Sequence, residues 1–85
     1  MKTIRIQSDL PCAVVKFDGE LHSHRKVAYF MFYDEAVSYT SLVSKFSRDY
    51  FAVVFFFVNG KEKVEYYRSG EAMEGFVPDV RYERL

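Results

Sequence analysis

The sequence predicts an α+β fold: a single domain in which a twisted antiparallel sheet, in the order β-β-β-α-β-β with an optional C-terminal edge strand, packs on one helix. Three observations support this class. Two apolar runs, residues 27–33 (VAYFMFY) and 51–58 (FAVVFFFV), have the length and the aromatic and β-branched content of buried strands. Asn59-Gly60 follows the second run and indicates a hairpin. Between the runs, residues 35–48 carry apolar side chains at helical spacing.

The N-terminal part of the chain predicts three strands. Residues 3–7 alternate apolar and polar side chains, and residues 13–17 form a second, more apolar strand. Asp18-Gly19 predicts a two-residue hairpin turn, because both positions of such a turn need a positive φ, which Gly adopts freely and Asp tolerates. The return strand is expected to begin at Glu20 and to reach the first apolar run through a bend with a bulge.

A helix is predicted over residues 35–48. Asp34 has the short carboxylate of an N-cap, which accepts hydrogen bonds from the free amides of the first turn. The acids at the start of this segment and the bases near its end suit the helix dipole. The apolar stripe expected to face the sheet consists of Ala36, Tyr39, Leu42, Val43 and Phe46.

The second hairpin is expected to turn at Asn59-Gly60 alone. Pairing outward from a two-residue turn places Phe56 opposite Lys63 and Ala52 opposite Tyr67. One face of this hairpin then carries Phe56, Val58, Lys61, Lys63 and Tyr67. The other face, the expected core, carries Phe51, Val53, Phe55 and Phe57 with Glu62, Val64 and Tyr66. Residues 69–75 are expected to be a loop, and Pro78 limits residues 76–85 to an edge strand.

One helix is too small to cover both faces of the expected sheet. A helix of about 14 residues is about 21 Å long and about 10 Å across, whereas about five or six strands make a sheet about 24 to 29 Å wide. Three covers are open: the sheet curls on itself, a second copy packs on it, or a different molecule does. Because large exposed apolar patches are unusual on monomers, the sequence favours an interaction surface.

Composition limits the classes of function. The 85 residues make one domain, spanning 1–85, and 49% hydrophobic residues exclude intrinsic disorder. Twelve Lys and Arg balance 12 Asp and Glu, so net charge does not attract nucleic acid or a membrane. Cys12 is the only cysteine, so no internal disulfide forms and a reducing cytoplasm is expected. Neither a signal-peptide pattern nor an apolar run of about 20 residues occurs, so no membrane association is expected.

The segment His22, His24, Arg25 and Lys26 is the alternative candidate site. The two histidines lie two positions apart and share one face of a strand, so they supply two ligands to a metal. A third ligand would come from Cys12, Asp18 or Glu20. The same group would suit an acid–base nuclease, with the cations stabilising the phosphate. Because this spacing is unspecific, and no GxGxxG or GxxxxGK pattern occurs, the sequence predicts no catalytic residue, no metal and no cofactor.

The leading functional expectation is a non-enzymatic protein that binds another macromolecule, in the manner of an inhibitor or an antitoxin. A protein is the favoured kind of partner. Its expected contact patch consists of Phe56, Val58, Lys61, Lys63 and Tyr67. A second copy of the chain, forming a homodimer, is also a possible partner. In size and composition the chain is similar to the small stand-alone inhibitors that phages and toxin–antitoxin systems carry. The alternatives are RNA or single-stranded DNA binding, with bases stacked on sheet aromatics, and a small His-dependent nuclease.

Overall fold

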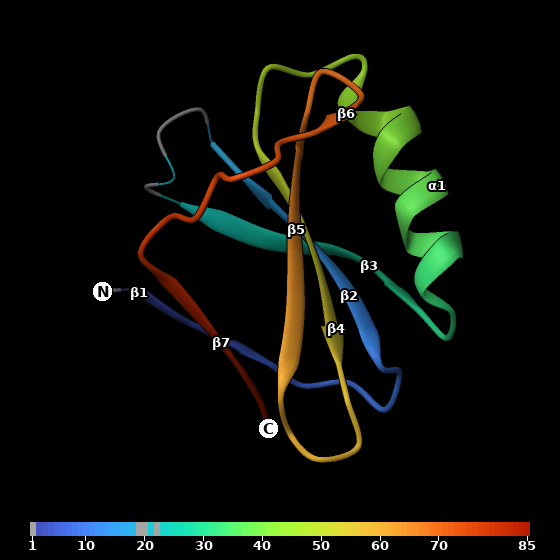
Figure 1. The fold of residues 1–85 in the computed structure, drawn as a ribbon, viewed down its shortest axis with the longest axis vertical. Coiled ribbons are helices and arrows are strands. Elements are labelled where there is room, and N and C mark those ends of the chain that lie inside the picture. The colour runs from blue at the N-terminus through green and yellow to red at the C-terminus, as the bar shows by residue number, and fades with distance from the viewer. Residues whose placement is uncertain (1, 19–20, 22) are drawn as a thin grey trace.

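The computed structural model describes residues 2–18, 21 and 23–85. The described residues form one helix and seven strands, shown in Figure 1. These elements are β1 (Lys2–Ile6), β2 (Cys12–Phe17), β3 (His24–Phe30), α1 (Tyr33–Ser44), β4 (Phe51–Phe56), β5 (Glu62–Arg68), β6 (Glu71–Ala72) and β7 (Val80–Arg84). The α+β class is confirmed, with one helix packed on a mostly antiparallel sheet.

The main sheet has five strands in the order β3-β2-β4-β5-β6, and each neighbouring pair is antiparallel. β1 and β7 are not part of this sheet; they pair with each other in parallel. The prediction that the C-terminal strand lies at an edge of the main sheet is therefore wrong. Both strands alternate apolar and polar side chains, so pairing them in register creates a two-stranded layer with one apolar face.

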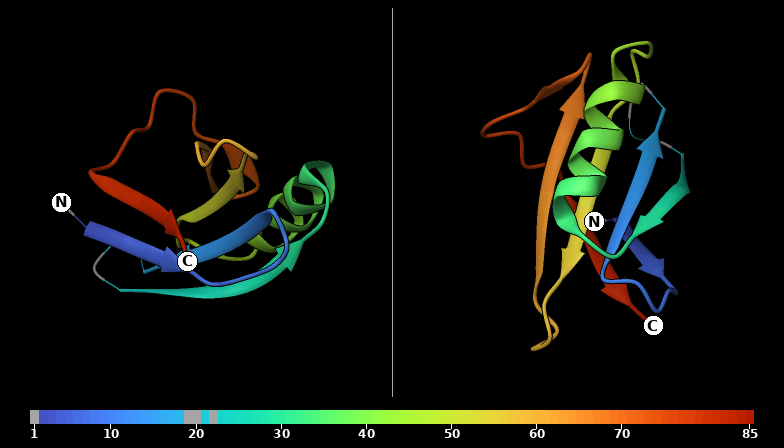
Figure 2. Two further views of the ribbon diagram at one scale, coloured as in Figure 1. Left: turned by 90° about the horizontal axis from the view of Figure 1, so that it is seen from below. Right: turned by 90° about the vertical axis from the view of Figure 1, so that its right-hand side faces the viewer.

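The β1–β7 layer covers the face of the main sheet opposite the helix. In Figures 1 and 2, β1 and β7 cross one side of the sheet and α1 lies on the other. Ile4, Ile6 and Tyr82 from the layer pack with Val54 and Phe56 of β4, and all five are buried. The favoured expectation, that another molecule covers this face, is wrong. The chain covers the face itself, through β1 and β7 rather than by curling of the sheet.

The helix packs on the sheet through small side chains at steps of four. Ala36, Thr40 and Ser44 are completely buried, whereas Leu42 and Phe46, expected in the stripe, are exposed. Small residues bring the helix axis close to the sheet, and this narrow contact leaves the larger side chains at its margins.

The helix also begins earlier than predicted. Phe32 is its N-cap, and no side-chain hydrogen bond caps it; Asp34 lies in the first turn, where a negative charge still suits the dipole.

The β4–β5 hairpin turns through three residues instead of two. The Phe57 amide donates to the Lys61 carbonyl at 2.8 Å, and the Gly60 amide donates to the Phe57 carbonyl at 3.0 Å. Of the loop residues 58–60, only Gly60 has a positive φ, whereas the two-residue turn would need one at Asn59 as well. The extra loop residue shifts the register by one position, which moves every β5 side chain to the other face.

Two other turns also differ from prediction. Asp18 pairs with Ser23 through its amide, which donates to the Ser23 carbonyl at 3.1 Å, so the connection from β2 to β3 is longer than Asp18-Gly19 alone. The predicted bulge is present in β3, at Val27, between the pairs Val14–Ala28 and Val15–Lys26. The two-residue turn with two positive φ values lies instead at Ser69-Gly70, in the segment expected to be a loop.

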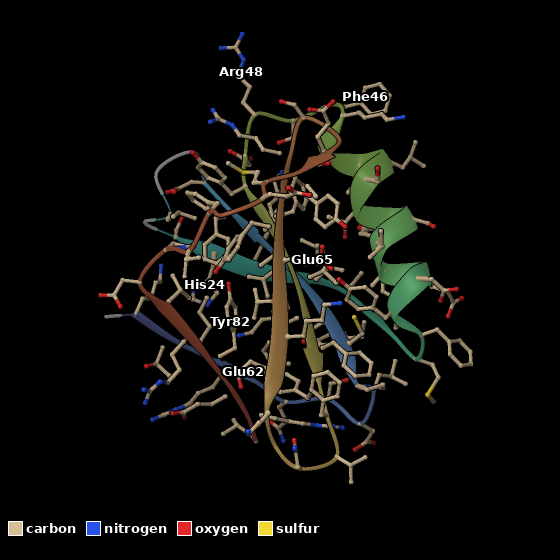
Figure 3. All side chains as sticks on the ribbon, viewed as in Figure 1. His24, Phe46, Arg48, Glu62, Glu65 and Tyr82 are labelled. Carbon is tan, nitrogen blue, oxygen red and sulfur yellow. The ribbon has the colours of Figure 1, made fainter. Side chains whose placement is uncertain are left out.

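Tyr66 and Tyr82 join the two layers through a buried hydrogen bond of 2.7 Å between their hydroxyl groups. Tyr82, labelled in Figure 3, contributes to this bond from β7. Burial raises the pKa of Tyr66 and, more strongly, that of Tyr82 above the ordinary tyrosine value. The folded protein therefore keeps both protons at pH values where the unfolded chain loses them.

This proton linkage predicts a loss of stability at alkaline pH. Because the folded-state pKa values are raised, the contribution of both groups is fully present below about pH 10, the unfolded tyrosine pKa, and is lost as the pH rises above it. Urea unfolding at pH 8, 9, 10 and 11 measures this. The double variant Tyr66→Phe/Tyr82→Phe is expected to lose less stability between pH 9 and 11 than the wild type. An equal loss in both proteins would contradict the linkage.

No helix among the described residues is long and apolar enough to cross a lipid bilayer.

Candidate functional site

The predicted contact patch on the second hairpin is not brought together in the structure. Phe56 and Tyr67 are only 5% and 6% exposed, and they face opposite sides of the sheet: Phe56 packs under the β1–β7 layer and Tyr67 under the helix. Val58 and Lys61 are exposed beside the hairpin turn. Lys63 lies opposite Phe55 on the helix side. The prediction that these five residues share one face is wrong, because it depended on the two-residue turn.

The alternative site on β3 is also divided between two faces. Arg25 pairs with Lys16 on the helix side, whereas His24 and Lys26 pair with Phe17 and Val15. His22 and Glu20 lie outside the described residues. Burial lowers the pKa of His24, and the positive charges of Lys2 and Lys26 lower it further, so its imidazole is neutral at pH 7.

Cys12 is completely buried in β2 and pairs with Phe30 and Phe55 on the neighbouring strands. Cys12 does not lie beside His24, as a third metal ligand would, because His24 pairs with Phe17 at the other end of β2. Burial raises the pKa of the Cys12 thiol to about 11, so it stays protonated at neutral pH and is a poor nucleophile. Among the described residues, no three His, Cys, Asp or Glu side chains group as a metal site.

Exposed apolar side chains gather where β3 passes into α1 and where β4 turns into β5. β3 ends at Phe30 and α1 begins at Tyr33, so Met31 and Phe32 lie in a two-residue connection. β4 ends at Phe56, so Phe57 and Val58 lie in the hairpin connection. In Figure 1 the β4–β5 connection lies at the bottom of the molecule and the β3–α1 connection lies at the right, just below α1. We call the surface formed by Met31, Phe32, Tyr33, Phe55, Phe57 and Val58 the aromatic end.

Ring contacts link the two connections. The Tyr33 and Phe55 ring centroids are 6.0 Å apart at 85°, and those of Phe55 and Phe57 are 5.1 Å apart at 72°, both edge-to-face arrangements. The Lys63 ammonium lies 4.6 Å from the centroid of the Tyr33 ring. These contacts hold the inner rings of the aromatic end in place, while Phe32 and Phe57 remain 62% and 47% exposed. The surface is therefore apolar, and its inner rings are preorganised.

Charges of both signs border the aromatic end. Asp34 and Glu35 are exposed in the first turn of α1, next to Tyr33. Lys61 and Lys63 lie on the hairpin side, where Lys63 is 3.8 Å from Glu65. An apolar centre with a mixed polar rim is the usual composition of a protein–protein interface. The adjoining carboxylates, by contrast, disfavour a polyphosphate backbone at this surface.

Met31, Phe32 and Phe57 are surface residues that the sequence pattern does not predict. They continue the two apolar runs without a break, so the pattern places them in strands. One signal was available: residues 27–33 end directly before the acidic first turn of the helix, so the last positions of the run must lie where the chain reverses. Side chains in such a connection cannot continue the ladder, and they project outward.

Comparisons with protein-family models, with curated proteins and with solved structures found no match for this chain. The fold and the surface together define a small α+β domain that presents a preorganised aromatic end.

Proposed function

We propose that this protein is a non-enzymatic binding protein that attaches to the surface of another protein through its aromatic end, in the manner of an inhibitor or an antitoxin. The observation that carries this proposal is the exposure of Met31, Phe32, Phe57 and Val58 at one end of a domain whose two sheet faces are buried. Exposing several large apolar side chains around a shared ring cluster is unfavourable in water, and monomers rarely expose a large apolar patch without a partner. This surface takes the place of the patch expected on the β4–β5 strands.

The bordering charges support a protein partner over RNA. A single-strand binder needs a continuous basic track beside its aromatic rings. At the aromatic end, Asp34 and Glu35 interrupt such a track on the helix side. A protein partner with an apolar pocket and its own mixed charges would match both the apolar side chains of the aromatic end and the charges around them.

We place this function in a reducing cytoplasm. Cys12 is the only cysteine of the chain, and it is buried, so neither an internal disulfide nor an exposed thiol needs an oxidising compartment.

Charge insertion at the aromatic end tests the proposal. Tagged wild-type protein and the double variant Phe32→Asp/Phe57→Asp are used to capture a binding partner, and the affinity is then measured with the purified partner. Truncating a central aromatic anchor costs about 2 kcal/mol or more, so we expect the double variant to bind at least about 100-fold more weakly. Phe32 is 62% and Phe57 47% exposed, and both lie in connections between elements, so the variant is expected to keep the wild-type circular dichroism spectrum.

Phe46→Asp is the matched control. Phe46 is 85% exposed and lies beyond the C-terminal end of α1, at the opposite end of the helix from Phe32 (Figure 3). We expect this variant to bind the partner like the wild type. Equal weakening by Phe46→Asp, or full binding by the double variant, would contradict a role for the aromatic end.

Two further measurements separate this function from its alternatives. Light scattering during size-exclusion chromatography shows whether the partner is a second copy, in which case the double variant elutes as a monomer and the wild type does not. Binding to a labelled RNA oligomer tests the nucleic-acid alternative. RNA binding that is steeply weakened by salt and removed by Lys61→Glu/Lys63→Glu would replace the protein-binding proposal.

A further inference from the structure

A cavity of about 260 Å³ lies between the C-terminal half of α1 and the adjacent ends of β2, β3 and β4. Its lining combines the aromatic rings of Tyr39, Phe46 and Phe51 with the charged ends of Lys16 and Arg25. Val27, Val43 and Ser47 complete it. None of the described residues that line it is an Asp or a Glu. The cavity is thus apolar, aromatic and positively charged, and it lies apart from the aromatic end.

The strand register places the two cations side by side. Lys16 of β2 pairs with Arg25 of β3 on one side and with Phe51 of β4 on the other. The Lys16 ammonium lies 5.7 Å from the centroid of the Phe51 ring and 3.5 Å from the Asp49 carboxylate, so part of its charge is compensated. Arg25 is exposed and makes no ion pair with any residue in the described part of the chain. Its guanidinium is available to an anion.

Phe46 forms the rim of the cavity. It follows the last turn of α1, where its amide donates to the Val43 carbonyl at 3.4 Å, and its ring projects from the end of the helix in Figure 3. No ring contact or apolar cluster among the described residues holds this side chain. A planar ligand in the cavity would give it a surface to stack on.

We propose that this cavity binds a small aromatic anion, whose flat ring lies against Tyr39 and Phe46 and whose phosphate or carboxylate is held by Arg25 and Lys16. A guanidinium recognises the planar oxygen pair of either anion through two parallel hydrogen bonds. Aromatic side chains stack on a planar ring without needing a particular ring structure. The volume lies just below the range of about 300 to 1,000 Å³ that holds drug-sized ligands, so it suits a ligand with a single planar ring system, up to the size of a mononucleotide.

A long polyanion fits less well than a small one. On the other side of Lys16 and Arg25, a second hollow of about 280 Å³ is lined by Asp18 and Asp49 as well as Ser23 and His24. The two carboxylates would repel the next phosphate of a nucleic-acid strand. The arrangement therefore favours a ligand that carries one anionic group.

Calorimetric titration with four probes tests the ligand class: adenosine 5′-monophosphate, adenosine, phenylacetate and inorganic phosphate. We expect saturable binding of at least one of the two aromatic anions. Adenosine has no anionic group and inorganic phosphate has no aromatic ring. Each is therefore expected to bind at least about 10-fold more weakly than the better aromatic anion. Absence of saturable binding of both aromatic anions at millimolar concentration, or phosphate alone binding as tightly, would overturn the proposal.

Variants of the cavity locate the site. Arg25→Gln and Phe46→Ala are each expected to weaken binding of the better aromatic anion by about 10-fold. Asp49→Asn is expected to strengthen it by about 3-fold, because it releases Lys16 from its present ion pair.

Two controls keep the cavity test separate from the test of the aromatic end. Arg81→Gln removes one exposed positive charge from β7, and Phe32→Asp/Phe57→Asp alters the aromatic end; both are expected to bind the anion like the wild type. Wild-type affinity in Arg25→Gln, or equal weakening in Arg81→Gln, would show that the anion binds elsewhere and would overturn the proposal.

Discussion

Tyr82→Ala is expected to lower the free energy of unfolding by about 3 to 5 kcal/mol, the usual cost of removing a large aromatic side chain from a core. Tyr82 is only 3% exposed and is the aromatic centre of the β1–β7 layer. The substitution leaves a cavity beneath this layer, and it also leaves the buried Tyr66 hydroxyl without its 2.7 Å partner. Urea unfolding followed by circular dichroism measures the change.

Tyr82→Phe is the matched control, because it keeps the ring and removes only the hydroxyl group. Its expected cost is about 1 kcal/mol, and the double variant Tyr66→Phe/Tyr82→Phe is expected to recover part of it by removing the unpaired hydroxyl. A loss below about 1 kcal/mol in Tyr82→Ala would mean that the β1–β7 layer does not stabilise the fold, and it would contradict the arrangement described above.

Gly70→Ala is expected to be the second most damaging of these substitutions. Gly70 has a φ of +84°, and a Cβ there would lie 2.5 Å from Lys45 Cγ and 3.4 Å from the Ser41 carbonyl oxygen. Its backbone also joins the helix: the amide donates to Ser44 Oγ, and the carbonyl accepts from Ser41 Oγ, both at 3.0 Å. The methyl group therefore strains the turn and separates it from α1.

Gly60→Ala separates backbone strain from packing. Gly60 has almost the same φ, +86°, but nothing lies within 4 Å of the position of its Cβ. We expect Gly60→Ala to cost about 1 kcal/mol through strain alone, and Gly70→Ala to cost about 1 to 3 kcal/mol more through overpacking. Thermal and urea unfolding of both variants measure the difference. Equal losses would show that the contact between the Ser69-Gly70 turn and α1 contributes little.

The elements of the fold and the strands joined in the two hairpins could be predicted from local patterns, but the hairpin registers and the pairing of β1 with β7 could not. The alternation of residues 3–7, the apolar runs and the helical spacing of residues 35–48 identified the strands and the helix. A dipeptide does not determine turn length: Asn59-Gly60 suits both a two-residue turn and a three-residue loop, and the choice between them reverses the faces of β5.

The position of β1 and β7 illustrates a second limit. Each strand has one apolar side, and nothing local indicates whether that side packs at an edge of the main sheet or across its face. The two ends of the chain meet through Ile4, Ile6 and Tyr82, a non-local pairing that only the complete core decides. The sequence indicated that one helix cannot cover the sheet and favoured another molecule over closure of the chain on itself, whereas the structure has β1 and β7 on that face.

The candidate site could likewise be predicted only in part. Val58 and Lys61 are on the surface as expected, whereas Phe56 and Tyr67 are in the two cores. The aromatic character of the surface was predictable from 19% aromatic residues in a small domain, since not all of them can be buried. Which aromatic side chains remain outside depended on where the strands end, and strand ends are the least certain feature of a sequence pattern.

One chain covers both faces of its own sheet, and the proposed function depends on this because it leaves only the aromatic end for a partner. An isotope-filtered nuclear Overhauser experiment on a mixture of labelled and unlabelled protein shows whether the cover comes from the same molecule. We expect cross-peaks from Tyr82 and Ile4 to the side chains of β4 and β5 within one molecule, at concentrations where light scattering shows a monomer. Cross-peaks to β4 and β5 that arise only between molecules, or none at all, would contradict the claim.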